Sequence, residues 1–429
     1  MDRKDPLYRR YLEILREELR PAMGCTEPVA LAYAAAMARE TLGILPEKAV
    51  IAVSGNVLKN VKSVTVPNTG GMRGIVAAAA AGIVAGDALA GLGVLERITE
   101  EQIARIREYA ENTPITVAHA DTGEVLDIAV TVTAQSGSAL VRIAGSHTNI
   151  VLIRKDGETL LEKDPETSQE AVSDRSCLTV EKIVAFAETA DLDDVRDVLE
   201  RQIGYNMAIA EEGLKNDYGA NIGKTLLSGH EDDLYFKMRA WAAAGSDARM
   251  NGCEMPVVIN SGSGNQGLTA SVPVIVYARE KRKTQEELLR ALLVSNLVTI
   301  HLKTGIGRLS AYCGVVSAGC GAAAGIAYLE GGRFDEIAHT VVNALATESG
   351  IICDGAKASC AAKIASAVDA GLLGYSMYKS GNQFYGGEGI VIKGVENTIR
   401  NVGRLARVGM CETDREIIRM MTEDAQEEG

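Results

Sequence analysis

The segments YCGVVSAGCGAAAGIAYL (residues 312–329) and GIICDGAKASCAAK (residues 350–363) contain four of the eight cysteines in this 429-residue chain. These four are Cys313, Cys320, Cys353 and Cys360, and Gly, Ala and Ser are abundant around them, although Tyr312 precedes Cys313 and two isoleucines precede Cys353. Small neighbours let the backbone approach a large group closely, and thiolates are ligands that soft metals prefer. We therefore expect this stretch to hold a metal cluster.

The overall charge limits the class of partner. The net charge is −13 at pH 7, and no basic face is visible for binding phosphates, so nucleic acid is an unexpected partner. The sequence offers no basic amphipathic helix of the kind that binds a membrane surface. The most apolar run, Ile75–Val84 with its continuation to Leu95, contains Asp87 and is typical of a buried helix instead of a membrane span.

The N-terminal sequence MDRKDPLYRRYLEIL is charged from its start and lacks the apolar core of a signal peptide. We expect a cytoplasmic protein, in which eight cysteines serve as reduced thiols or metal ligands more often than as disulfides. Aromatic residues make up only 4% of the chain. Ala and Gly supply the apolar fraction instead, which predicts tightly packed helices.

The hydrophobic pattern predicts an α+β protein. Helical spacing over residues 6–20 and after Pro28 predicts two N-terminal helices. Alternating Val and Ile over residues 48–67 predict strands, with Ser54-Gly55-Asn56 as a turn, and an Ala-rich helix follows over 75–90. Residues 114–163 read as strands with hairpin turns at DTGE and KDGE. Beyond the polar segment 163–175 the pattern becomes helical almost to the end.

These patterns divide the chain into three parts. Residues 1–45 form N-terminal helices that bridge the lobes, residues 46–162 form an α/β lobe with a mixed sheet, and residues 176–429 form a largely helical lobe. A bridging position would place Cys25 between the lobes, where small-ligand sites often lie.

Glycine-rich loops are candidate sites for a substrate carboxylate, because successive backbone N–H groups can surround an anion. Two such loops lie in the α/β lobe, and a third, SGSGNQG (residues 261–267), interrupts the helical series. In the third loop, the amides look placed to hydrogen-bond a small polar ligand. The candidate substrate-binding residues are Ser54, Asn56, Asn68, Thr69, Gly70, Asn265 and Gln266.

Cys25 lies in Gly24-Cys25-Thr26-Glu27-Pro28, a turn that opens a helix. Thr26 suits the N-cap and Pro28 the first helical turn. A cysteine at this position has a lowered pKa because the helix dipole favours the thiolate. The alternative is a small buried cysteine in a turn.

Structural zinc does not fit the sequence, since no CxxC pair and no HExxH motif occur. Cys313, Cys353 and Cys360 lie 40 and 7 residues apart, so two loops around a helical hairpin could bring three thiolates to one cluster. Spacing alone leaves this open, because unrelated buried cysteines are common.

Four motifs in order resemble the L-cysteine desulfidase family, which is related to the iron–sulfur L-serine dehydratases. They are GCTEP (24–28), SGSGNQG (261–267), YCGVVSAGCGAAAG (312–325) and ICDGAKASC (352–360), and the resemblance covers nearly the whole chain. It implies a 4Fe–4S cluster bound by three cysteines, which match Cys313, Cys353 and Cys360. It also implies that Cys25 accepts the substrate proton.

The same resemblance implies the reaction: L-cysteine and water give pyruvate, ammonia and hydrogen sulfide by α,β-elimination. Three protein ligands would leave one iron open to the substrate sulfur, and a thiolate with a pKa near ambient pH suits proton abstraction. Cys320 is not a ligand in the family pattern, and Cys177, Cys253 and Cys411 are expected in the core or at the surface. Lys357 and Lys363 could tune the cluster charge, although solvated lysines are the simpler interpretation.

Three other functions stay open. An iron–sulfur L-serine dehydratase would use the hydroxyl as leaving group, and a non-catalytic iron–sulfur redox sensor would use Cys25 to sense oxidants. A metabolite-binding protein without metal is the least specific alternative. Strand order and assembly into a homo-oligomer are left open.

Overall fold

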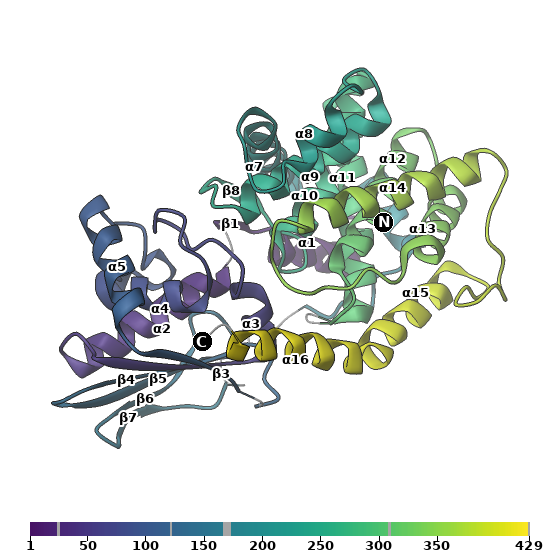
Figure 1. The fold of residues 1–429 in the computed structure, drawn as a ribbon. Helices are drawn as coiled ribbons and strands as arrows, with labels where there is room; N and C mark the ends of the chain where they lie inside the picture. Colours follow the sequence, from purple (N-terminus) through teal and green to yellow (C-terminus); the bar gives the residue numbers. More distant parts are fainter. Residues whose placement is uncertain (24–25, 121, 166–172, 308–309, 428–429) are drawn as a thin grey trace.

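The computed structural model describes residues 1–23, 26–120, 122–165, 173–307 and 310–427, and it contains two lobes (Figure 1). The α+β class is confirmed: N-terminal helices and a six-stranded mixed sheet precede a mostly helical C-terminal region. No helix in the described ranges is long and apolar enough to span a membrane.

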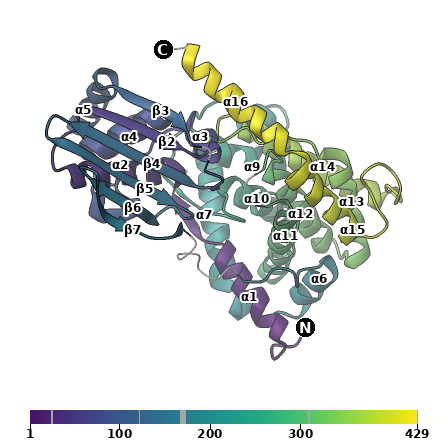
Figure 2. The ribbon, with the colours of Figure 1, turned by 90° about the horizontal axis from the view of Figure 1, so that it is seen from below.

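The α/β lobe is a sheet covered on one face by α2, α4 and α5 (Figures 1 and 2). Its elements are α2 (Thr26–Leu42), β2 (Lys48–Val53), α3 (Gly55–Val61), α4 (Gly74–Ala85), η1 (Ala88–Gly93), α5 (Glu100–Asn112), β3 (Ile115–His119), β4 (Asp127–Ala134), β5 (Gly137–Ala144), β6 (Ile150–Lys155) and β7 (Glu158–Glu162).

The strands lie in the order β3-β2-β4-β5-β6-β7, and only the β2–β3 pair is parallel. The predicted hairpin at KDGE is confirmed, because Asp156 and Gly157 both have positive φ between paired β6 and β7. The predicted hairpin at DTGE is wrong. Strand β2 lies between β3 and β4 and pairs with both, so the DTGE segment connects strands that are not neighbours.

A second correction concerns residues 57–67, which were expected to continue as a strand. Residues Gly55–Val61 form helix α3 instead, and its side chains Val57, Leu58 and Val61 are buried at helical spacing. Packing of these three side chains outweighs the strand preference of the β-branched residues.

The helical lobe contains the rest of the chain, including the first helix. Its elements are α1 (Pro6–Glu18), β1 (Pro21–Met23), α6 (Val180–Thr189), η3 (Leu192–Asp194), α7 (Arg196–Lys215), α8 (Ile222–Leu227), α9 (Leu234–Met250), β8 (Pro256–Val258), α10 (Gly264–Glu280), α11 (Gln285–Ile306), α12 (Gly314–Leu329), α13 (Phe334–Glu348), α14 (Cys360–Lys379), α15 (Val395–Arg404), η4 (Leu405–Gly409) and α16 (Cys411–Glu427).

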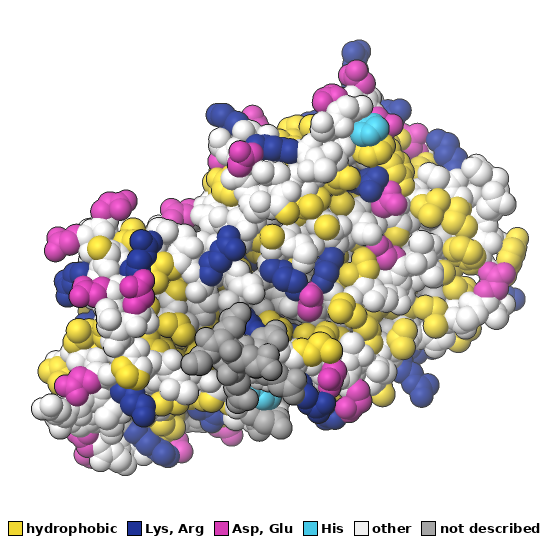
Figure 3. Space-filling view, in the orientation of Figure 1, with side chains coloured by type: hydrophobic (Ala, Val, Ile, Leu, Met, Phe, Trp, Pro, Cys, Tyr) yellow, Lys and Arg dark blue, Asp and Glu magenta, His cyan; other side chains and the backbone are white. Residues whose placement is uncertain are grey.

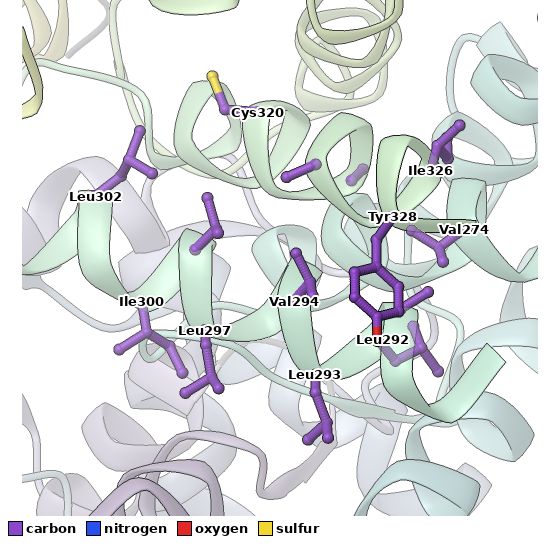
Figure 4. Close-up of a cluster of buried hydrophobic side chains, with 14 of the residues drawn as sticks. Val274, Leu292, Leu293, Val294, Leu297, Ile300, Leu302, Cys320, Ile326 and Tyr328 are labelled. Carbon is purple, nitrogen blue, oxygen red and sulfur yellow. The ribbon is translucent and has the colours of Figure 1, made fainter. Parts of the chain in front are cut away.

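The core of this lobe lies around α11 and α12 (Figure 4). Leu292, Leu297 and Ile300 of α11 are fully buried against their neighbours. Helix α1 joins the same core through Tyr11, whose ring lies 5.1 Å from that of Phe186. Helix α2 belongs to the α/β core instead, so the two N-terminal helices pack in different lobes.

Helix α16 crosses from the helical lobe to the α/β lobe, where it packs on α3 (Figure 2). A Cβ built at Gly55 would lie 2.2 Å from the Ile418 Cδ1, so the Ile418 side chain packs directly on the start of α3. Lys62 Nζ donates a hydrogen bond to the Met421 carbonyl at 2.7 Å. The C-terminal helix therefore fastens the two lobes together.

Close packing of α2 on α4 yields a stability prediction. A Cβ at Gly82 of α4 would lie 2.1 Å from the Ala32 carbonyl oxygen of α2. Glycine-to-alanine changes ordinarily stabilise a helix, but Gly82→Ala should lower the free energy of unfolding by about 1–3 kcal/mol because the helices must separate.

Gly204 of α7 is the matched control, because nothing lies within 4 Å of a Cβ built there. Gly204→Ala should raise the free energy of unfolding by up to about 1 kcal/mol. Denaturant titration of both variants measures the contrast. An equal gain in stability from the two changes would contradict the described α2–α4 contact.

Candidate cysteine-ligated metal centre

A short backbone ladder aligns Cys313 with Cys353. The Cys313 N–H donates to the Ile351 carbonyl at 2.9 Å, and the Cys353 N–H donates to the Ala311 carbonyl at 2.6 Å. Tyr312 pairs with Ile352 between them as an antiparallel bridge. Because side chains alternate along extended backbone, both cysteines extend to the side opposite the bridging pair. The loop before α12 and the loop after α13 thus present two thiols on one face.

Cys360 is the first residue of α14, and its Sγ lies 3.5 Å from the Gly355 carbonyl oxygen. Gly355 has a φ of +96°, and a Cβ there would lie 2.0 Å from the Lys59 carbonyl oxygen of α3. Only glycine can occupy this position without moving one of the two segments. The loop that carries Cys353 is therefore pressed against the α/β lobe.

The three thiols influence one another. A hydrogen bond from the Cys313 thiol to the Cys353 sulfur raises the pKa of Cys313 and lowers the pKa of Cys353. Burial raises the pKa of Cys360, and the charge of Cys353 acts in the same direction. The Gly355 N–H, Lys59 and Lys303 also lower the pKa of Cys353. The group is thus arranged to carry a thiolate, the form that binds soft metals.

Two buried lysines reach this group from opposite lobes. Lys59 of α3 is 3% exposed and pairs with Asp414 of α16. Lys303 of α11 is 7% exposed, and among the described residues no acidic side chain lies within salt-bridge distance of its ammonium. Burial lowers the pKa of Lys303, while Cys353 and Cys313 act in the opposite direction. An ammonium buried beside thiols is costly unless negative charge is brought to it.

Lys357 and Lys363 have a different role from the buried pair. Both pair with Asp354, Lys357 at 2.5 Å, next to Cys353 in the chain. Burial alone would raise the pKa of Asp354, but the two lysines outweigh it and lower that pKa. They brace the loop between Cys353 and Cys360 instead of standing free in solvent.

The donor set fits an iron–sulfur cluster better than a single ion. Within the described ranges, no three His, Cys, Asp or Glu side chains converge closely enough to hold one metal ion. A polynuclear cluster places several atoms between its protein ligands, so its thiolates stand further apart than the ligands of one zinc ion. Cys313, Cys353 and Cys360, with the positive charges of Lys59 and Lys303, are suited to hold such an anionic group.

The remaining described cysteines lie elsewhere. Cys320 is 2% exposed in the helical core and projects from the side of α12 turned away from α11 (Figure 4). Burial raises its pKa, and neighbouring Glu348 acts in the same direction. Cys253 is buried, Cys177 is half-buried and Cys411 is exposed.

Two predicted substrate-binding amides each have an unsatisfied buried oxygen. Asn56 Oδ1 of α3 and Gln266 Oε1 of α10 have no hydrogen-bond donor among the described residues. Gln266 lies beside the centre, because a Cβ at Gly314 would be 2.6 Å from the Gln266 Cδ and Gly314 follows Cys313. A buried acceptor without a donor costs about 1–3 kcal/mol, which a ligand ammonium would relieve.

The other predicted loop residues are already engaged. Ser54 Oγ donates to the Val125 carbonyl at 3.0 Å, and Asn265 Oδ1 accepts from Arg249 at 3.3 Å. In the loop after α3, Asn68 Nδ2 donates to the Leu95 carbonyl at 3.0 Å and Thr69 Oγ1 to the Val66 carbonyl at 2.8 Å. Gly70, in the left-handed region, lies against Ile103 of α5. No described contact joins this loop to the cysteines.

Cys25 lies outside the described residues, between β1 and α2. In the same motif, Glu27 at the start of α2 accepts a hydrogen bond from Asn60 Nδ2 of α3 at 3.1 Å. Helix α3 therefore meets the GCTEP motif through Asn60 and the Cys353 loop through Lys59.

Neither Lys59 nor Lys303 was predicted from the sequence as a residue of the site. The one available signal for Lys303 is that no other Lys, Arg, Asp or Glu follows Arg290 in the sequence of α11. Lys59 gives no such signal, because its burial depends on α16, more than 350 residues away in the chain.

Comparison with known proteins identifies the family. The profile of the serine dehydratase alpha chain family matches residues 89–419. A UPF0597 protein of Desulfitobacterium hafniense is 56% identical over 98% of both chains. Another UPF0597 protein, from Treponema denticola, is 48% identical over 97% of this chain and 98% of its own. A Shewanella relative of that name is 37% identical over 97% of this chain and its whole length.

The UPF0597 name specifies no activity, so the family description carries the assignment. The matched region includes all three clustered cysteines, the helical lobe from α6 into α16, and the part of the α/β lobe from α5 to β7. The chain belongs to the serine dehydratase alpha chain family.

Proposed function

We propose that the protein is an L-cysteine desulfidase, a carbon–sulfur lyase that holds a 4Fe–4S cluster on Cys313, Cys353 and Cys360. Family membership indicates a lyase of the dehydratase type. The observation that carries the proposal is that three thiols lie together beside Lys303, a buried lysine with no acidic partner among the described residues. The substrate preference and the cluster type are inferences from the sequence motifs.

The reaction breaks the Cα–H and Cβ–S bonds of L-cysteine. The α-proton passes to a base, sulfide leaves with the C–S electron pair, and the resulting 2-aminoacrylate becomes an imine that water hydrolyses to pyruvate and ammonia. When bound, the cluster would supply a Lewis-acidic iron with an open position for the leaving group. We assign the base to Cys25, whose position before α2 favours the thiolate.

The chain's own groups would orient the substrate and balance charge. The unsatisfied oxygens of Asn56 and Gln266 are acceptors for the substrate ammonium. Ser54, Asn68, Thr69, Gly70 and Asn265 remain candidates for the carboxylate, through backbone N–H groups where their side chains are already bonded. Lys303 and Lys59 would stabilise the negative charge of the thiolates and of the departing sulfide.

L-Serine dehydration is the second candidate, and the family description favours it. The two substrates differ only in the leaving group, sulfide or hydroxide. Anaerobically prepared protein should release sulfide from L-cysteine with a kcat/KM at least tenfold above that for pyruvate formation from L-serine. The reverse order would establish a serine dehydratase, and iron binding without turnover of either amino acid would support a redox sensor.

Iron content tests the ligand assignment. Cys313→Ala, Cys353→Ala and Cys360→Ala should each lower iron and acid-labile sulfide per chain by at least about half, because each removes a cluster bond. Colorimetric iron and sulfide counts after anaerobic purification measure this. Cys411→Ala, at an exposed cysteine, is the matched control and should keep the wild-type content. Full iron in all three ligand variants would refute the assignment.

Lys303→Met tests the buried charge. The change should lower turnover of L-cysteine at least about tenfold because the sulfide loses an electrostatic partner. The metal-free protein should unfold at no lower temperature, since a buried ammonium is replaced by an apolar chain of similar length. Lys182→Met, at an exposed lysine, is the control. Unchanged turnover in Lys303→Met, measured at equal iron content, would remove Lys303 from the mechanism.

A further inference from the structure

A cleft of about 570 Å³ lies between the α/β lobe and the C-terminal half of α16. Its walls come from α3, the first turn of α4, the edge strand β3 and the α16 residues Met421 and Thr422. Small-molecule sites in proteins occupy roughly 300–1,000 Å³, so the cleft is large enough for a metabolite.

The cleft is separate from the cysteine centre. Leu58 of α3 and Lys62, the residue just after this helix, line it. Asn56 and Asn60 lie two positions before Leu58 and Lys62, respectively. Residues two positions apart in a helix point to nearly opposite sides. Asn60 donates a hydrogen bond to Glu27, a residue of the GCTEP motif. Helix α3 therefore stands between the cleft and the proposed substrate site.

Among the described residues, the two charged side chains that line the cleft, Lys62 and Arg73, are both basic. His119 adds an imidazole, and no Asp or Glu of the described chain lines the cleft. On the face shown in Figure 3, acidic and basic side chains are intermixed over both lobes, and the chain as a whole carries a net charge of −13. A basic cleft on an acidic protein attracts anions.

The two cations of the lining are not neutralised by carboxylates. Lys62 donates to the Met421 carbonyl at 2.7 Å, and Arg73 Nη2 lies 3.5 Å from the Asn251 amide oxygen. No salt bridge to either side chain occurs within the described ranges. Both keep donors available to a ligand.

The backbone adds donors to the same cleft. Ile75 and Val76 belong to the first turn of α4, a 12-residue helix, and both line the cleft. First-turn N–H groups lack partners within the helix and carry partial positive charge. Gly74, just before them, donates its own N–H to the Val64 carbonyl, so the free amides begin at the cleft.

Apart from Thr422, the rest of the lining is apolar or glycine and includes Leu58, Val117 and Met421. A cleft that combines basic groups with aliphatic side chains suits an anion with a hydrocarbon part. An amino acid is disfavoured, because its ammonium would meet Lys62 and Arg73 with no acidic partner in the described lining.

We propose that this cleft binds an organic carboxylate that has an aliphatic chain and lacks an amino group. Arg73 and the first turn of α4 receive the carboxylate, and Leu58, Val117 and Met421 contact the chain. The ligand would touch α16 and the α/β lobe together, so its binding holds α16 in the position where Asp414 pairs with Lys59 beside the cysteines.

A pair of ligands that differ at one carbon tests the proposal. Isothermal titration of the full-length protein with 4-methyl-2-oxopentanoate should show saturable binding, and L-leucine should bind at least tenfold more weakly because of its ammonium. Equal affinity for the two, or displacement of the oxo acid by L-cysteine, would overturn the assignment. The titration needs no turnover, so its outcome does not depend on the proposed reaction.

The variant Arg73→Gln locates the site. It should weaken 4-methyl-2-oxopentanoate binding about tenfold, the loss expected for one charged hydrogen bond. Arg73 is exposed, so the fold should persist, and the thermal midpoint without ligand checks this. Arg279→Gln, at an exposed arginine of α10, is the control. Wild-type affinity in a folded Arg73→Gln would contradict the proposed site.

Discussion

The contact on which the centre depends is the approach of Gly355 to the Lys59 carbonyl. That contact leaves no room for a side chain, and it holds the Cys353 loop of the helical lobe against α3 of the α/β lobe. The ladder between residues 311–313 and 351–353 then carries the constraint to Cys313. Backbone geometry therefore positions the thiols before any metal binds, which lowers the ordering cost of taking up a cluster.

Buried polar and charged groups at this site lack partners among the described residues. Burying Lys303 without a carboxylate partner among the described residues costs free energy that packing elsewhere must offset. The same holds for the unsatisfied oxygens of Asn56 and Gln266. The proposed function gives these groups one explanation, because an anionic cluster and a substrate ammonium would supply the charges and donors that the described residues lack.

The sequence predicted the parts of the fold that follow from local pattern. The helices of the C-terminal lobe, the strand region and the KDGE hairpin were identified from periodicity and turn residues. Helix α3 was missed because tertiary burial of Val57 and Val61 outweighed strand preference. The position of β2 between β3 and β4 was missed because non-local pairing leaves no trace in a turn motif.

The same distinction between local pattern and tertiary contact applies to the candidate site. Small residues around Cys313, Cys353 and Cys360 indicated ligands, and the structure brings these three together, while their role in binding a cluster stays a proposal. Lys59 could not be found from sequence, because its burial depends on contact with distant α16. Several loop residues were chosen for their glycines and amides, yet Asn68 and Thr69 use their side chains to hold the loop itself.

The central claim is that three protein thiolates leave one iron of a cluster open to the sulfur of L-cysteine. Mössbauer spectroscopy of anaerobic protein reconstituted with ⁵⁷Fe tests it most directly. On addition of L-cysteine, we predict that one of four iron sites changes its isomer shift and quadrupole splitting while the other three stay unchanged. Spectra that show four equivalent irons with and without L-cysteine would contradict the account.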